Sequence, residues 1–537
     1  MRRTFTLLIV LIICSMAKAQ SIERPKLVVG IVVDQMRWDY LYRYYDRYST
    51  GGFKRLLNEG FSCENTFIPY TPTVTACGHS TIYTGAPPAI SGISGNVWWD
   101  KEQMRLVYCT EDTTVNTVGS TTALGKMSPK NMLVTSICDE LRLATNFRSK
   151  VIGIAIKDRG GILPAGHSAN AAYWYDNTTG DWISSTYYMN ELPGWVKDFN
   201  KQKVVDKYYQ QGWNLLYAPD TYVQSTADEK IYEGKSLGNK FPYDLKKFVG
   251  KNYGILPVTP YGNTFTADFA KAAIAGEKLG DDNITDFLTI SFSSPDYIGH
   301  TFGPNSLEAE DGFLRLDKEL AGLLDLLDTK VGKGQYTVFL SADHGVIQVP
   351  EFLQENKLPA GRAYMNSLKD KLNHALKEKY NMDNIIVSDD NYQVHLNHPR
   401  LDSAKTNKKE VIQWIVDRLS ADSNIFRAFA LADLNTVPLP ARIREMINNG
   451  YNPRRNGDIQ ILLYPQHIEG YSATGTTHGV WNPYDSHIPL LWFGWGIKQG
   501  KTNKETYMTD IAPTVAAMLR IQMPSGCTGH VIEEVMK

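Results

Sequence analysis

Five apolar segments restrict what this chain can fold into. Each is rich in Val, Ile, Leu or Phe, and long connections with helical patterns separate them; the segments are KLVVGIVV (26–33), KVIGIAI (150–156), DFLTISFSS (286–294), YTVFL (336–340) and IPLLWFG (488–494). Continuous apolar runs of this length are typical of parallel strands that are buried on both faces. We therefore predict an α/β fold, doubly wound around a mainly parallel sheet.

The clearest helix is expected in the stretch PNSLEAEDGFLRLDKELAGLLDLLD, residues 304–328. Asn305 is a suitable N-cap residue, with Glu308 three positions later. The apolar positions recur at helical spacing and form one stripe, which comprises Phe313, Leu316, Leu320, Leu323 and Leu327. Such a stripe indicates ordinary packing against a core.

Two stretches interrupt the alternation of strands and helices. Residues 165–275 are rich in Tyr, Trp, Asn and Gly, and residues 350–475 combine a basic helix with short strands. We interpret the first as an insertion over the functional site and the second as an α+β insertion. The α/β core would then consist of residues 20–164, 276–349 and 476–537.

The N-terminus has the pattern of a cleaved secretory signal over residues 1–19. Arg2 and Arg3 precede the apolar run FTLLIVLIICSM, and Ala17-Lys18-Ala19 follows as a cleavage site. We expect an exported protein, periplasmic or alternatively secreted; the paired arginines leave twin-arginine export open beside the ordinary route.

The overall charge gives no indication of a nucleic-acid partner or of a membrane surface after signal cleavage. The chain has 56 basic and 57 acidic residues, so a single-sign surface is not expected. We expect a monomer that acts on small molecules. The five cysteines that remain after cleavage specify no disulfide framework and no thiolate metal site; they are Cys63, Cys77, Cys109, Cys138 and Cys527.

Polar side chains follow the predicted strands at the points where the strands end. They are Asp34 after the first strand, Lys157 and Arg159 after the second, Asp296 and His300 after the third, and Asp343 and His344 after the fourth. Ligands of open α/β sheets bind beyond the carboxyl ends of the strands. We therefore expect these side chains to converge on one crevice.

Residue type and spacing suggest metal binding in this crevice. Asp296 and His300 have the i, i+4 spacing that brings side chains together on a helix. With His478 from GTTHGVW, the candidates comprise three aspartates and three histidines. Carboxylates and imidazoles in these numbers suit a pair of Zn²⁺ ions that keep positions open for substrate.

A candidate nucleophile lies in PYTPTVTACGHSTIYTG, residues 69–85. Thr75 stands before a predicted helix, whose N-terminus favours an anion. A metal would activate its hydroxyl by stabilising the alkoxide, so Thr75 is also counted among the metal ligands. Asn96, in GISGN, could donate a hydrogen bond to the same site.

Together these motifs resemble a known family. VVDQM, PTVTACGH, GISGN, KDR, DYIGH, SADHG, THGVW and the closing MTDIAPTVAAMLRIQMPSG look like the alkaline phosphatase superfamily, and within it the PafA-like alkaline phosphatases with a threonine nucleophile. The resemblance spans nearly the whole chain after the signal. It implies the alkaline phosphatase type of fold.

The resemblance also implies a role for each candidate, position by position. Thr75 matches the nucleophile that forms a covalent phosphothreonine. One zinc would be held by Asp296, His300 and His478, the second by Asp34, Asp343 and His344, and the phosphate oxygens by Asn96, Lys157 and Arg159.

Charge favours phosphate monoesters as substrates. Two Zn²⁺, three aspartates, Lys157 and Arg159 would leave a pocket with net positive charge, which suits a dianionic monoester. Two alternatives stay open: a phosphodiesterase or nucleotide pyrophosphatase with the same two-zinc core, and a non-catalytic protein that binds a phosphorylated ligand. Other histidines, such as His79, His167 and His487, are expected to have structural or surface roles.

Overall fold

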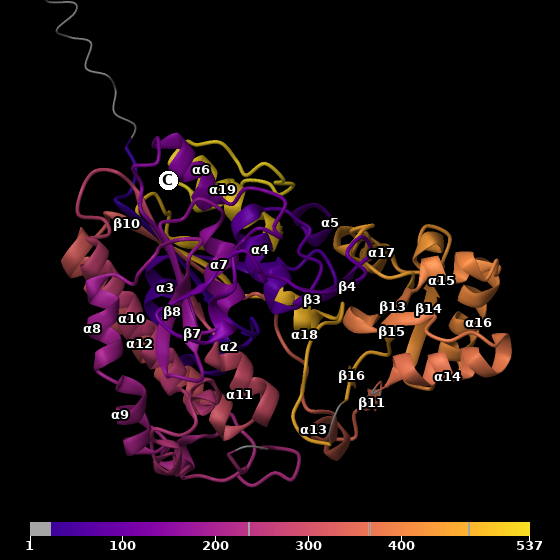
Figure 1. The fold of residues 1–537 in the computed structure, drawn as a ribbon. Helices are drawn as coiled ribbons and strands as arrows, with labels where there is room; N and C mark the ends of the chain where they lie inside the picture. Colours follow the sequence, from indigo (N-terminus) through magenta and orange to yellow (C-terminus); the bar gives the residue numbers. More distant parts are fainter. Residues whose placement is uncertain (1–22, 235–236, 364, 366, 471–472) are drawn as a thin grey trace, which may run out of the picture.

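The computed structural model describes residues 23–537, apart from 235–236, 364, 366 and 471–472. A large lobe surrounds an eleven-stranded sheet, and a smaller lobe with its own sheet lies to one side of it (Figure 1). The predicted signal peptide, residues 1–19, falls outside the described residues. Within the described residues, each helix is too short or too polar to cross a membrane.

Five adjacent strands of the large sheet run parallel. Their order is β10 (Tyr336–Ser341), β1 (Leu27–Val33), β9 (Asp286–Phe292), β6 (Val151–Ala155) and β7 (Ala171–Asp176). Each of the first four is buried along its whole length. This confirms the predicted α/β fold, and it places the carboxyl ends of these strands at one edge of the sheet.

The remaining strands of this sheet make it mixed, and the fifth predicted parallel strand is antiparallel. β18 (Leu490–Gly494) pairs with β10 in reverse, so that Leu490 lies opposite Ser341. The chain enters β18 at the carboxyl edge of β10 and must run back across the sheet. An apolar run indicates burial but not strand direction, which explains the difference from the prediction.

Helices cover both faces of the parallel strands. α4 (Thr75–Thr84) lies against β1 at Gly30, where an added Cβ would clash with the Tyr83 hydroxyl oxygen. Glycine thus allows the helix that begins at Thr75 to lie close to the sheet. α7 (Asp158–Ala165) packs on the same face, whereas α10 (Tyr261–Glu277) covers the opposite face, where Phe269 contacts Tyr173.

The predicted long helix is α12 (Leu307–Leu327), and its apolar stripe is buried. Its N-cap is Ser306 rather than Asn305: the Ser306 hydroxyl accepts a hydrogen bond from Ala309 N at 3.1 Å. The helix starts at Leu307, one residue later than expected, so Ser306 is the residue directly before it and its hydroxyl reaches the N–H of the third helical residue.

Most of residues 165–275, the first proposed insertion, lies between β7 and β9. It contains β8 (Asp181–Ser185), α8 (Gly194–Lys201) and α9 (Val204–Gln211). Asp311 of α12 anchors the loop that follows, because it accepts hydrogen bonds from Trp213 Nε1 at 2.8 Å and Leu216 N at 2.7 Å.

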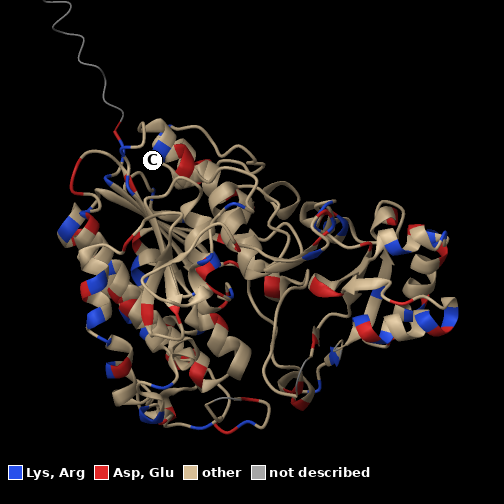
Figure 2. Cartoon of the chain, in the orientation of Figure 1, with Lys and Arg blue, Asp and Glu red and all other residues tan. Residues whose placement is uncertain are grey.

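The smaller lobe has a four-stranded sheet in the order β12 (Ile386–Ser388), β13 (Gln393–Leu396), β15 (Ile459–Leu463) and β14 (Ile425–Ala430). Helices α14 (Leu368–Tyr380) and α16 (Lys408–Ser420) pack on it and form a separate apolar core. Acidic and basic residues are interspersed on the outer helices of both lobes (Figure 2). The boundaries of the two insertions stay a prediction.

Other elements complete the fold. They are α2 (Tyr40–Arg43), α3 (Phe53–Glu59), β2 (Phe61–Phe67), α5 (Pro88–Ser91), β3 (Val97–Asp100), β4 (Arg105–Tyr108), β5 (Thr117–Val118), α6 (Ile137–Ala144), α11 (Ser294–Phe302), α13 (Pro350–Glu355), β11 (Gly361–Ala363), α15 (His398–Ser403), α17 (Ala441–Gly450), β16 (His467–Glu469), α18 (Pro483–Ser486), β17 (His487–Ile488), β19 (Gly500–Tyr507) and α19 (Ile511–Leu519).

Candidate active site

Polar side chains lie together at the carboxyl ends of four neighbouring parallel strands. Asp34 follows β1, Lys157 follows β6, Asp296 follows β9 and Asp343 follows β10. The exposed fraction of each of these residues is 5% or less. Their convergence follows from the strand order, since the carboxyl ends of adjacent parallel strands meet at one edge.

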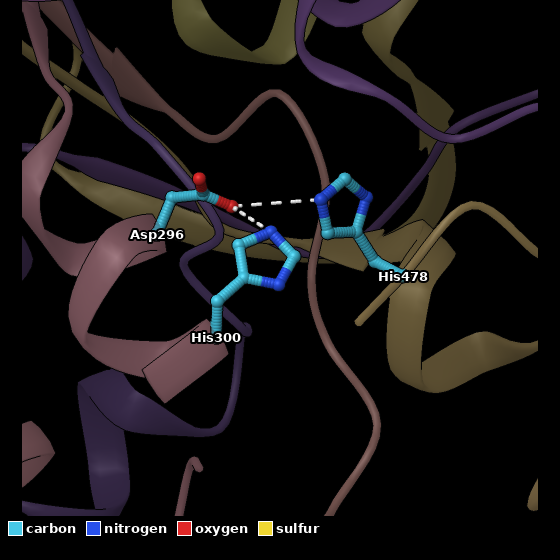
Figure 3. A group of neighbouring side chains, drawn as sticks. All are labelled: Asp296, His300 and His478. Atoms are coloured by element: carbon cyan, nitrogen blue, oxygen red, sulfur yellow. Dashed lines mark ion pairs between the residues drawn. The ribbon is translucent and has the colours of Figure 1, made fainter. Parts of the chain in front are cut away.

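Asp296, His300 and His478 form the first group of candidate metal ligands (Figure 3). α11 brings Asp296 and His300 together, with His300 Nε2 at 3.1 Å from Asp296 Oδ1; His478 Nε2 is 3.5 Å from the same oxygen. The Nδ1 atoms of the two rings face backbone carbonyl oxygens, of Thr476 at 2.8 Å and of Thr73 at 2.7 Å. Donation from Nδ1 to a carbonyl leaves Nε2 as the ligand atom, an arrangement found for histidines that bind metals.

Asp34, Asp296 and His344 form a second candidate group, in which the ligand atoms lie within 4.8 Å of one another. Asp343 adjoins this group, because its Oδ2 is 3.4 Å from His344 Nε2. Asp34 Oδ1, Asp343 Oδ2 and His344 Nε2 are buried and have no hydrogen-bond partner among the described residues. Buried polar atoms without partners are costly unless a ligand satisfies them, so these residues fit a pair of divalent cations.

Lys157 lies between the two groups. Its Nζ is 2.7 Å from Asp34 Oδ2 and 2.6 Å from Asp296 Oδ2. Burial lowers the pKa of Lys157, but Asp296 and Asp34 outweigh this effect, so that its pKa is raised overall and the amine stays charged. Lys157 therefore neutralises one of the buried carboxylates, which leaves negative charge for metal cations to balance.

Burial has opposite effects on the pKa values of Asp34 and His344. It raises the pKa of Asp34 well above its usual range, with Asp343 adding to the effect, and it lowers the pKa of His344 to about 3. Desolvation disfavours the charged form in both cases. His344 is thus neutral at pH 7, as a metal ligand must be.

Thr75 is the first residue of α4, and its hydroxyl oxygen lies 3.4 Å from Lys157 Nζ. Asn96 lies next to Thr75, because Asn96 Oδ1 accepts a hydrogen bond from Ala76 N at 2.9 Å. The Nδ2 amino group of Asn96 is then the end of its amide that can donate to a ligand. Arg159, in the first turn of α7, donates from Nη1 to the Tyr108 hydroxyl at 3.1 Å. The structure therefore groups Thr75, Asn96 and Lys157, with Arg159 held two residues after Lys157.

Two residues contact this site that were not predicted to belong to it. His79, expected to be structural, has Nδ1 at 3.3 Å from Asp343 Oδ2 and Nε2 at 2.8 Å from the Ser291 hydroxyl. Gln35 donates from Nε2 to Asp296 Oδ1 at 2.7 Å and from its backbone N to Asp343 Oδ1 at 3.1 Å. The available signals were the i, i+4 spacing of His79 from Thr75 and the position of Gln35 directly after Asp34.

Comparison with known proteins places the chain in a family. The family model described as type I phosphodiesterase / nucleotide pyrophosphatase matches residues 28–485. Alkaline phosphatase PhoV of Synechococcus elongatus is 54% identical over 525 residues, which are 96% of this chain and 94% of that protein. Alkaline phosphatase PafA of Elizabethkingia meningoseptica is 49% identical over 539 residues, 99% of this chain and 98% of that protein.

Solved structures agree with these sequence matches. The crystal structure of wild-type PafA matches with a TM-score of 0.95 over 96% of this chain and 100% of that chain. A PafA variant with one threonine, one asparagine, one lysine and one arginine replaced matches with a TM-score of 0.94 at 48% identity. Murine ectonucleotide pyrophosphatase / phosphodiesterase 5, with a TM-score of 0.51 and 14% identity, shares the fold. The chain belongs to the PafA-like alkaline phosphatases, within the type I phosphodiesterase / nucleotide pyrophosphatase family.

Proposed function

We propose that this protein is an exported, zinc-dependent phosphate monoester hydrolase that releases inorganic phosphate through a covalent phosphothreonine at Thr75. The position of the Thr75 hydroxyl supports the proposal most directly. It lies at the N-terminus of α4, 3.4 Å from Lys157 Nζ, which itself contacts Asp34 of one candidate metal group and Asp296 of both.

Six residues would hold two Zn²⁺ ions. Asp296, His300 and His478 would hold the first, and Asp34, Asp343 and His344 the second. Bound zinc would supply Lewis acidity that stabilises charge on the attacking and the leaving oxygen of an in-line displacement. The orphaned ligand atoms and the uncompensated carboxylates support this assignment.

The residues of the chain provide the rest of the reaction. Thr75 Oγ1 forms a bond to phosphorus as the ester P–O bond breaks; the Thr75 proton passes to water, and the ester oxygen takes a proton from water and leaves as the alcohol. Water then cleaves the phosphothreonine, which restores the Thr75 hydroxyl and releases phosphate. Lys157, Arg159 and the Asn96 amide would hold the phosphate oxygens through both steps, where fixed donors stabilise developing charge.

The relatives support the same reading. PhoV and PafA are both named alkaline phosphatases. The four residue types replaced in the PafA variant, threonine, asparagine, lysine and arginine, are those of Thr75, Asn96, Lys157 and Arg159, in the same order along the chain.

The decisive experiment compares Thr75→Ala with the parent on an aryl phosphate. We expect turnover to fall by roughly three orders of magnitude or more, as for other lost nucleophiles. Thr84→Ala is the matched control, because it removes a threonine hydroxyl from the other end of the same helix, where Thr84 bonds to Ser80 O. Undiminished turnover by Thr75→Ala, with phosphate released at the parent rate, would exclude the proposal.

A second candidate function is hydrolysis of phosphodiesters, which the matching family model favours. A diester has one negative charge where a monoester has two, so it needs less cationic stabilisation. We expect Lys157→Ala to lose much more activity on monoesters than on diesters. Equal losses on both substrates would remove the charge argument for monoesters.

A further inference from the structure

One β-hairpin connects two residues of the candidate phosphate site: Asn96, which bonds to Ala76 N beside Thr75, and Tyr108, which bonds to Arg159. Strands β3 and β4 pair in antiparallel register with Val97 opposite Tyr108, and Cys109 N donates to Asn96 O at 3.0 Å just beyond that pair. Asn96 therefore stands at the base of one strand and Tyr108 at the base of the other. A rigid hairpin fixes both residues relative to each other.

Tyr108 links this hairpin to Arg159. The Tyr108 hydroxyl donates to Asp158 Oδ1 at 2.7 Å and accepts from Arg159 Nη1 at 3.1 Å. Its single proton goes to the carboxylate, so the oxygen lone pairs face the guanidinium. Thr110, on the same side of the hairpin, donates to Asp158 Oδ2 and fixes that carboxylate in turn.

These hydrogen bonds occupy Nη1 of the Arg159 guanidinium and leave its other nitrogens for a ligand. Arg159 Nε is buried and has no hydrogen-bond partner among the described residues. Arginine presents its donors in a planar fork, so fixing one nitrogen fixes the direction of the others. The backbone of Tyr108 is also held in place, because its carbonyl oxygen accepts a hydrogen bond from Asn131 Nδ2 at 3.3 Å.

We propose that Tyr108 is a positioning residue for phosphate binding: through its hydroxyl it fixes the guanidinium of Arg159, while Asn96 of the same hairpin contacts the phosphate directly. The inference rests on the proposed function and deepens it, since the hairpin would select substrates with a terminal, dianionic phosphate. Tyr108 itself does not touch the substrate, so its whole effect passes through Arg159.

The test is a double-mutant cycle on an aryl phosphate with Tyr108→Phe, Arg159→Ala and the combined variant. We expect Tyr108→Phe to lower kcat/KM about tenfold, in line with the loss of a hydrogen bond to a charged group. In the Arg159→Ala background the same change should have less than about a twofold effect, because the group that it positions is gone.

Two further readouts separate positioning from simple structural damage. The inhibition constant of inorganic phosphate should rise in Tyr108→Phe and in Arg159→Ala, whereas activity on an aryl phosphodiester should change little. Tyr208→Phe is the matched control, because it also removes a tyrosine hydroxyl that donates to an aspartate: Tyr208, on α9, bonds to Asp268 Oδ2 at 3.0 Å. This variant should leave the kinetic and inhibition constants unchanged. Thr110→Val, which loosens Asp158, should give a weaker effect of the same kind and replaces Tyr108→Phe if that variant does not fold.

Additive losses in the cycle, or equal losses on the monoester and the diester, would overturn the inference about Tyr108. Its failure is distinguishable from failure of the proposed function. If only the inference fails, Thr75→Ala is inactive, while Tyr108→Phe either behaves like the parent or shows one of the two patterns of loss just named. If the proposed function fails, Thr75→Ala keeps the parent's turnover.

Discussion

Replacing Lys157 with methionine tests the electrostatic balance of the site without any substrate. The amine is the cation that contacts both Asp34 and Asp296, at 2.7 and 2.6 Å, and the side-chain exposed fractions are 3% for Lys157, 0% for Asp34 and 5% for Asp296. Methionine keeps much of the volume and removes the charge. Both carboxylates then lose a buried counter-ion in the metal-free protein.

The size of the effect follows from the burial of the pair. Removing one partner of a buried ion pair costs about 3–5 kcal/mol, because the remaining charge is left uncompensated. Unfolding entropy is about 2.1 cal/mol/K per residue, so for a chain of 537 residues this cost corresponds to a fall in melting temperature of about 3–4 °C. With saturating Zn²⁺ the zinc ions would balance the carboxylates in place of Lys157. We then expect the melting temperature of Lys157→Met to fall by less than about 1–2 °C.

Differential scanning calorimetry in chelator and in excess Zn²⁺ measures both values. Lys130→Met is the control, because Lys130 pairs with Asp112 at 2.8 Å while its side chain is 42% exposed, and exposed pairs contribute about 0–1 kcal/mol. If Lys157→Met melts with the parent in chelator, or is equally destabilised with and without zinc, the reasoning about charge balance is wrong.

Two further predictions concern metal stoichiometry and pH. Asp296 is a proposed ligand of the first zinc only, but a carboxylate oxygen of Asp296 also lies within 4.8 Å of ligand atoms of Asp34 and His344. Elemental analysis should therefore find more zinc lost from Asp296→Ala than from His300→Ala, and equal losses would show that Asp296 has no influence on the second zinc. His395 is buried in the smaller lobe, its ring nitrogens have no hydrogen-bond partner among the described residues, and burial lowers its pKa from 6.5 to about 4. Between these values the unfolded chain binds a proton that the folded protein does not, so stability falls as pH drops through this window, by up to about 1.4 kcal/mol per pH unit. Melting curves of His395→Leu should show a shallower dependence on pH than those of the parent or of the exposed-site control His374→Leu, and parallel curves would rule out this role of His395.

Much of the core fold could be predicted from the sequence because burial of parallel strands leaves a local pattern. The runs that become β1, β6, β9 and β10 are mostly apolar, and a charged residue of the carboxyl edge follows each strand within four residues. The direction of β18 could not be predicted, since pairing with β10 involves residues about 150 positions apart in the chain and an apolar run looks alike in either direction.

For the candidate site, too, some features could be predicted from the sequence and others depend on the tertiary structure. The sequence by itself determined the ligand types, the helical i, i+4 relation of Asp296 and His300, and the placement of Thr75 at a helix start, because these depend on neighbours within a few residues. The tertiary structure decided that Lys157 contacts both Asp34 and Asp296, that Gln35 donates to the Asp296 carboxylate, and that the Tyr108 hydroxyl accepts from the Arg159 guanidinium. Such contacts form between segments brought together by the sheet, and their distances and directions are set by packing rather than by local sequence.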